Sequence, residues 1–189
     1  HLKKSYPDHQ FHLVGEAAVN DAFRSVANAD SAVIIPLMIL ILGIFLTFLF
    51  RNFLAVCMPI IVITFSILSS LGVGFLFGVK FNSILSVIPA IMIAIGIADS
   101  VHLLMSFFQI KRNFPNKQAL KMALEKNITP TFLTSLSTAI GFFSLMATDL
   151  IPIKEFGGIA GLGAMIAWFA TIFGIAPIIA LTDIPVPKW

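Results

Sequence analysis

Long runs without a charged residue limit what this chain can fold into more than any other feature. The runs occupy residues 32–50, 53–79, 81–98, 128–148 and 156–182. A helix needs about 20 residues to cross the hydrocarbon core of a bilayer, and the runs lack the alternating pattern of a membrane-barrel strand. They predict an all-α integral membrane protein with five transmembrane helices. If Asp99 and His102 lie inside the membrane, the third span covers 81–109.

The composition supports the same class. Of the 189 residues, 58% are hydrophobic and only 11% are charged, whereas about 25% are charged in a soluble domain. The net charge of +3 is small, and no polar segment alternates basic with aromatic residues, so we expect no nucleic-acid partner. Cys57 is the single cysteine, which excludes a disulfide within the chain.

Lysine and arginine are distributed unevenly between the two ends of the predicted helices. One end carries seven of them, namely Arg51, Lys111, Arg112, Lys117, Lys121, Lys126 and Lys188. The short loops at the other end carry Lys80 and Lys154. Positive residues favour the cytoplasmic side. We therefore expect a multi-pass protein of a bacterial-type inner membrane, with residues 111–127 in the cytoplasm and residues 1–30 outside.

The polar head at 1–30 predicts the C-terminal end of an extracytoplasmic domain. "FHLVG" at 11–15 is typical of a strand, and the following "EAAVNDAFRSVANADSAV" is typical of a helix that leads into the first span. Since the chain begins with His1, we expect a piece of a longer protein. Residues 31–185 are then the transmembrane bundle.

The connection 111–127 is the longest one between the predicted spans. It carries Leu120, Ala123 and Leu124 at helical spacing. This pattern predicts an amphipathic helix that lies on the membrane surface.

Asp99 lies in the middle of an apolar span, within "AIGIADSVHLLMSFF". A carboxylate at this depth costs about 3 kcal/mol or more, so the group is neutral or faces a partner or water. Gly96, Asp99, His102 and Ser106 share one helix face. Two interpretations are open for Asp99: a hydrogen-bonded group that holds helices together, or a carboxyl that carries protons. His102 either relays protons or shapes the same cavity, and these two side chains are too few for a metal site.

The fourth span is rich in hydroxyl groups. Thr131, Thr134, Thr138 and Gly141 form one stripe at steps of three and four residues. The hydroxyls either bond to the preceding turn of their own helix or face the Asp99 helix and serve its carboxyl or water.

Small residues mark the expected helix contacts. Gly157 and Gly161 form a Gly-x-x-x-Gly pair in the last span, and small residues let helix backbones approach closely. We expect the same packing role for Gly96 and Gly141. Ser100 has no recognisable base or oxyanion donors, so we expect no enzyme activity, and no cofactor is indicated.

Three segments resemble a known superfamily in the same order: "AIGIADSVHLL", "LTSLSTAIGFFSL" and "DLIPIKEFGGIAGLGAMIAW". They resemble the membrane half of the resistance-nodulation-division (RND) superfamily, most closely the MMPL-type exporters, with the sterol-sensing domain of Patched-like proteins as a more distant relative. The resemblance implies helices two to six of one repeat, preceded by the end of a porter-type domain. The "IADSVHLL" segment and the "PVP" exit indicate the N-terminal repeat.

The resemblance also implies a mechanism. The proton-coupling carboxyl of the family corresponds to Asp99, and polar positions of its fifth helix correspond to Thr134 and Thr138. Many relatives have two acidic residues in this motif, whereas Ala98 precedes Asp99 here. His102 and Ser106 are expected to shape the polar slot around the carboxyl.

The expected function is a proton-motive-force-driven exporter of lipids or other amphiphilic molecules. The alternative is a sensor or regulator of the sterol-sensing type that does not transport, and a third reading is a structural membrane subunit. A mid-membrane titratable carboxyl favours the exporter, because a sensor does not require one. Expected partners are membrane lipids, the second repeat of the full-length protein, a hydrophobic or amphiphilic substrate and, as a further option, a second copy.

Overall fold

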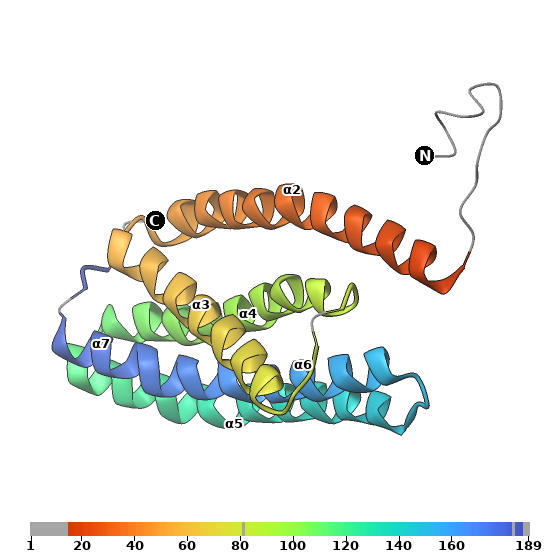
Figure 1. Cartoon of the computed structure of the whole chain (residues 1–189). Coiled ribbons are helices and arrows are strands. Elements are labelled where there is room, and N and C mark those ends of the chain that lie inside the picture. The colour runs from red at the N-terminus through yellow and green to blue at the C-terminus, as the bar shows by residue number, and fades with distance from the viewer. Residues whose placement is uncertain (1–14, 81, 183, 187–189) are drawn as a thin grey trace.

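The computed structural model describes residues 15–80, 82–182 and 184–186, and these residues contain helices but no strand (Figure 1). The long helices are α2 (Glu16–Phe50), α3 (Phe53–Leu76), α4 (Ile88–Lys111), α5 (Asn116–Ser144) and α6 (Ile151–Ala170). Short elements extend some of them, namely η1 (Leu85–Val87) before α4, η2 (Leu145–Ala147) after α5, and the π-helical turn η3 (Thr171–Ile175) and α7 (Ala176–Leu181) after α6.

The prediction of an all-α membrane protein with five spanning helices is confirmed. The helices that are long and apolar enough to cross a membrane are Ala32–Phe50, Phe53–Leu76, Leu85–Lys111, Asn116–Ala147 and Ile151–Leu181. The strand predicted at 11–15 lies, except for Gly15, outside the described residues. The helix predicted after it is continuous with the first span in α2.

The connection predicted at 111–127 is helical from Asn116, but it does not form a helix of its own. Helix α5 begins at Asn116, directly after Pro115, and continues without a break to Ser144. The apolar side of its first turns is buried in the protein rather than laid on the membrane surface, because Ala119, Leu120 and Ala123 are all buried. Pro130 lies inside this helix and does not end it.

Helix α6 packs against α3, α4 and α5. It runs beside α5 over most of its length, while α2 lies at the edge (Figure 1). Gly163 permits a close approach of three helices, because a Cβ atom there would lie 2.5 Å from the Sδ atom of Met92 in α4 and 3.1 Å from the Cβ atom of Ser70 in α3. Helices α3, α4 and α6 are therefore closely packed around Gly163.

Two apolar clusters fill the bundle at different depths. One cluster includes Met92 of α4 and Ile159 of α6. The other, larger one includes Leu103 of α4 and Trp168 of α6, and extends to the end of α4. Between these clusters, the buried residues of α4 include Gly96, Asp99 and Ser100, so a layer with polar groups lies between two apolar cores.

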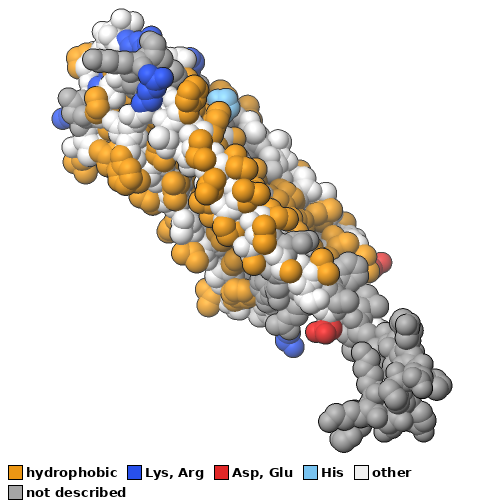
Figure 2. All heavy atoms as spheres, turned by 90° about the horizontal axis from the view of Figure 1, so that it is seen from above, with side chains coloured by type: hydrophobic (Ala, Val, Ile, Leu, Met, Phe, Trp, Pro, Cys, Tyr) orange, Lys and Arg blue, Asp and Glu red, His pale blue; other side chains and the backbone are white. Residues whose placement is uncertain are grey.

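The two ends of the bundle differ in charge. In the space-filling view, lysine and arginine side chains gather at one end of the elongated molecule, and hydrophobic side chains cover its middle (Figure 2). At the basic end, the Nδ2 atom of Asn116 donates to the carbonyl of Ile179 at 2.9 Å. At the opposite end, the Nδ2 atom of Asn82 donates to a carboxylate oxygen of Glu155 at 3.1 Å.

The close contact of α6 with α5 gives a stability prediction. A Cβ atom at Gly157 would lie 2.5 Å from the backbone oxygen of Phe142, whereas a Cβ atom at Gly141 would meet nothing within 4 Å. We expect Gly157→Ala to force the helices apart and to lower stability by about 1–3 kcal/mol. The measurement is the midpoint of thermal unfolding in detergent. Gly141→Ala is the control, and equal midpoints for both variants would contradict the packing described here.

Candidate functional site

Asp99 is the charged group at the centre of the polar layer. It lies about 18 Å along the axis of α4 from Lys111, and only 4% of it is exposed. Its Oδ2 atom accepts a hydrogen bond of 3.0 Å from the hydroxyl of Ser135 in α5. Ser135 is itself buried, so a carboxyl and a hydroxyl pair inside the protein near the middle of the membrane.

A second polar contact lies one turn further along α5. The indole Nε1 atom of Trp168 in α6 donates to the hydroxyl of Thr131 at 3.0 Å, and this hydroxyl donates to the backbone oxygen of Asn127 at 2.7 Å. The ring of Phe132 packs against the edge of Trp168, with 5.0 Å between ring centroids. Thr131 therefore connects α5 to α6 with both its donor and its acceptor used.

A third polar contact follows after another turn, toward the basic end. The hydroxyl of Ser106 in α4 donates to the Oδ1 atom of Asn127 at 3.2 Å, and the Nδ2 atom of Asn127 donates to the carbonyl of Ala123 at 2.7 Å. Ser135, Thr131 and Asn127 are spaced by four residues, which is about 6 Å of rise per step. We call these three residues, with Asp99, the polar ladder.

Two further buried hydroxyls lie in the same part of the bundle. Ser100 of α4 and Thr171, directly after α6, are almost fully buried, and their hydroxyl oxygens have no hydrogen-bond partner among the described residues. Thr171 is the first residue of the π-helical turn η3. π-Turns inside helices are often found at functional sites, and a buried hydroxyl without a partner is costly.

The structure separates the predicted proton-coupling residues into two groups. Asp99 and Ser106 face the protein interior, but Ser106 bonds to Asn127 rather than to the carboxyl. His102, one turn after Asp99 on α4, is exposed. Thr134 is exposed and donates to the backbone oxygen of Pro130 at 3.0 Å. Thr138, which is half-buried, donates to the backbone oxygen of Thr134 at 2.8 Å.

The threonine hydroxyls thus bond within their own helix, which is one of the two interpretations left open by the sequence. Sequence reasoning did not single out Ser135, Asn127 or Trp168. A signal for the first two was present: Asn127, Thr131, Ser135 and Ala139 recur every four residues and are all buried. The predicted stripe contains Thr134, whereas the buried face contains its neighbour Ser135. The two sets share only Thr131.

The predicted packing glycines also differ in their surroundings. A Cβ atom at Gly96 would lie 2.9 Å from a side-chain atom of Ile63, and one at Gly161 would lie 2.7 Å from the ring of Phe143. A Cβ atom at Gly157 would lie still closer to its neighbour, 2.5 Å from the backbone oxygen of Phe142 in α5. Gly141 is exposed with open space around it. Gly96 is the glycine closest to the carboxyl, and its contact brings α3 against α4 one turn before Asp99.

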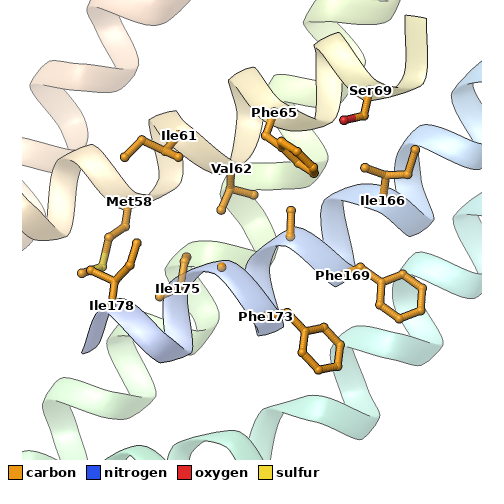
Figure 3. A pocket seen from close by; sticks show the side chains of 12 residues that line it. Met58, Ile61, Val62, Phe65, Ser69, Ile166, Phe169, Phe173, Ile175 and Ile178 are labelled. Carbon is orange, nitrogen blue, oxygen red and sulfur yellow. The ribbon is translucent and has the colours of Figure 1, made fainter. Parts of the chain in front are cut away.

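An apolar groove lies between α3 and the end of α6, beside the polar layer. Its volume is about 590 Å³, and Ile61, Val62 and Phe65 of α3 line it opposite Phe169 and Phe173 (Figure 3). Ser69 is the hydroxyl residue of this lining. The groove suits a hydrocarbon chain or ring system, and it offers no charged side chain to a ligand.

The chemistry available at the polar layer is proton binding and hydrogen bonding. No three His, Cys, Asp or Glu side chains of the described residues come together as a metal site. A buried carboxyl can exist in a neutral and a charged form, and Ser135 can donate to the charged form. The layer can therefore bind and release one proton inside the membrane.

Comparison with known proteins places this arrangement in a family. The sterol-sensing domain of SREBP cleavage-activation matches residues 47–183. The chain is 25% identical to the apo-petrobactin exporter of Bacillus anthracis over 87% of its own length and 23% of that protein. It is 36% identical to the hopanoid transporter HpnN of Rhodopseudomonas palustris over 35% of the chain and 8% of that protein.

A similar match extends to an animal protein. Protein patched homolog 1 of Danio rerio is 28% identical over 51% of the chain and 8% of its own length. No solved structure matches the chain. The chain spans about a quarter or less of the length of these relatives. The match over most of the chain shows that it belongs to the sterol-sensing domain family and is related to the RND and MMPL exporters.

Proposed function

We propose that this chain is the membrane part of a proton-motive-force-driven exporter of lipids or other amphiphilic molecules. It would form one of two repeats in a longer protein of a bacterial-type inner membrane, after the end of a porter-type domain. The single observation that carries the proposal is the carboxyl of Asp99, buried near mid-membrane with a hydroxyl partner but without an ion pair to a described lysine or arginine.

The hydrogen bond from Ser135 supports a proton-carrying role for this carboxyl. Hydrogen bonds to a charged acceptor are stronger than neutral ones, so Ser135 stabilises the ionised form at the moment of proton release. When Asp99 is protonated, the charge is absent and the cost of burial falls. The two forms therefore favour different arrangements of α4 against α5, which is the difference that alternating access requires.

The polar ladder supports a direction for proton release. From Ser135, polar side chains continue along α5 through Thr131 to Asn127, toward the end of the molecule where lysine and arginine gather. We propose that this end faces the cytoplasm, because positively charged residues favour that side. Protons would then reach Asp99 from outside and leave along the ladder.

The relatives support transport and leave a second function open. Two of them are an apo-petrobactin exporter and a hopanoid transporter, which fits export of hydrophobic or amphiphilic molecules. The second candidate is a sterol-sensing regulator that binds an apolar ligand without transporting it. The apolar groove between α3 and α6 favours this candidate, because a site lined almost wholly by hydrocarbon needs no proton coupling.

The first prediction concerns Asp99→Asn in the full-length protein. Asparagine matches the shape of aspartate and still forms hydrogen bonds, but it cannot bind or release a proton. We expect normal insertion and expression, with substrate efflux under an imposed pH gradient reduced to the level of vesicles without protein. Efflux at the wild-type rate would show that Asp99 does not carry protons, and the sterol-sensing regulator would then be the better description.

The second prediction separates Ser135 from its neighbours. Ser135→Ala removes the donor to the carboxylate, which is worth about 1.5–3 kcal/mol for a charged acceptor. We expect transport to slow by roughly 10- to 100-fold and its pH dependence to move to higher pH, because proton release becomes harder. Ser137→Ala is the matched control, since Ser137 is exposed and bonds to the backbone of Thr134. Equal effects of both changes would contradict the assignment.

The third prediction tests the orientation. In a Cys57→Ser background, cysteine at exposed Gln118 should react in whole cells only with membrane-permeant thiol reagents. Cysteine at exposed Asp149, at the other end of the bundle, should react with impermeant reagents as well. The opposite labelling pattern would invert the proposed topology.

A further inference from the structure

A small groove at the basic end of the bundle lies where α5 crosses α7. Its volume is about 340 Å³. One wall is a face of α5, and the other is Ala180 of α7. The α5 side chains that line it are Lys117, Leu120, Lys121, Leu124, Glu125 and Ile128. These residues recur at steps of three and four, so they form one face of the helix.

The two lysines of this face lie nearer the start of α5 than its last apolar residue, and Glu125 lies between Leu124 and Ile128. Lys117 and Lys121 lie near the start of the helix, and Leu124 and Ile128 lie further into it. The span that contains them has 32 residues, which is about 48 Å of helix and exceeds the ~30 Å hydrocarbon core. Because lysine does not lie in hydrocarbon, the excess is at the lysine end. The groove therefore crosses the boundary between headgroups and acyl chains.

The charges of the groove leave its lysines available to an anion. Glu125 lies 3.8 Å from the Nζ atom of Lys121, and the two side chains are 65% and 77% exposed. Such exposed pairs are weak, so a phosphate can displace the carboxylate from Lys121. Lys117 is also exposed on the same face. Two ammonium groups one turn apart match a single phosphodiester.

The walls of the groove are held in place by polar contacts at the same crossing. The Nδ2 atom of Asn116 donates to the carbonyls of Ile179 at 2.9 Å and Thr182 at 3.3 Å. The Nζ atom of Lys111 donates to the carbonyl of Ile184 at 2.5 Å. Asn116 thereby ties the start of α5 to the end of α7, and Lys111 ties the end of α4 to the segment after α7. Little ordering is then needed when a ligand binds.

We propose that this groove binds an anionic phospholipid from the surrounding leaflet. The headgroup phosphate lies between Lys117 and Lys121, and the first part of an acyl chain lies over Leu124 and Ile128, against Ala180. The proposal does not depend on proton coupling or on the substrate of transport. It assigns a separate lipid site at the end of the bundle away from Glu155.

The test uses the full-length protein in phosphatidylcholine nanodiscs that contain increasing amounts of phosphatidylglycerol. Native mass spectrometry of the released protein measures retained phosphatidylglycerol. Each lysine near an anionic surface contributes enough for about a fivefold change in affinity, so Lys117→Gln with Lys121→Gln should weaken retention roughly 30-fold. Lys126→Gln is the control, because Lys126 is on the same helix but does not line the groove. If Lys126→Gln loses as much retained phosphatidylglycerol as the double variant, the proposed site is wrong.

A second variant distinguishes the groove from general attraction to an anionic surface. Ala180→Trp fills the groove and keeps both lysines, so it should also reduce retention of phosphatidylglycerol. Wild-type retention by this variant overturns the proposal, because binding would then need only surface charge. Inorganic phosphate at millimolar concentration should not displace the lipid, and displacement would likewise overturn it. The thermal midpoint of each variant shows whether it folds, and Lys117→Gln alone serves if the double variant does not.

Discussion

The burial of one carboxyl between packed helices is the constraint on which the arrangement of this bundle depends. In water, Asp99 would need no partner. Near the middle of a membrane the charged form must be stabilised by the protein, and here a hydroxyl of α5 does so at 3.0 Å. This contact requires α4 and α5 to meet with a defined rotation, since a turn of about 100° on either helix would point the side chain at lipid.

The close packing of α6 makes that defined rotation achievable. Gly163 admits the side chain of Met92, and Gly157 lies against the backbone of α5. Trp168 then reaches Thr131 from α6. Apolar clusters lie on both sides of the polar layer along the bundle. Small residues thus set the spacing of the helices, and the polar contacts set their rotation.

The sequence alone was sufficient for the features that depend on composition and length. The five spans and the buried carboxyl follow from uncharged runs and from one acidic residue within them. The partner of that carboxyl did not follow. Thr134 and Ser135 are adjacent, and both are compatible with a polar helix face, but only the packing of α5 against α4 and α6 decides which one points inward. Tertiary contact supplies this information, and hydroxyl content does not.

The sequence alone also does not show that α5 is one continuous helix. An amphipathic segment before a span can lie on the membrane or extend the span, and the pattern of Leu120, Ala123 and Leu124 is the same in both cases. Burial of Ala119 and Ala123 against the bundle favours the straight continuation. Burial of His102 was equally unpredictable. Its spacing from Asp99 suggests a shared face, yet His102 is exposed while Asp99 is buried.

The shape of α2 has a mechanical consequence. Its 35 residues make a rod of about 52 Å, and the apolar part from Ala32 to Phe50 accounts for little more than half of it. Leu46 and Phe50, at one end, are fully buried in the larger core, while most side chains of the span before them are exposed. The helix also touches η1 further along its length. A sideways force on its N-terminal half is therefore carried by two supports, the buried end beside Phe108 and the contact with η1.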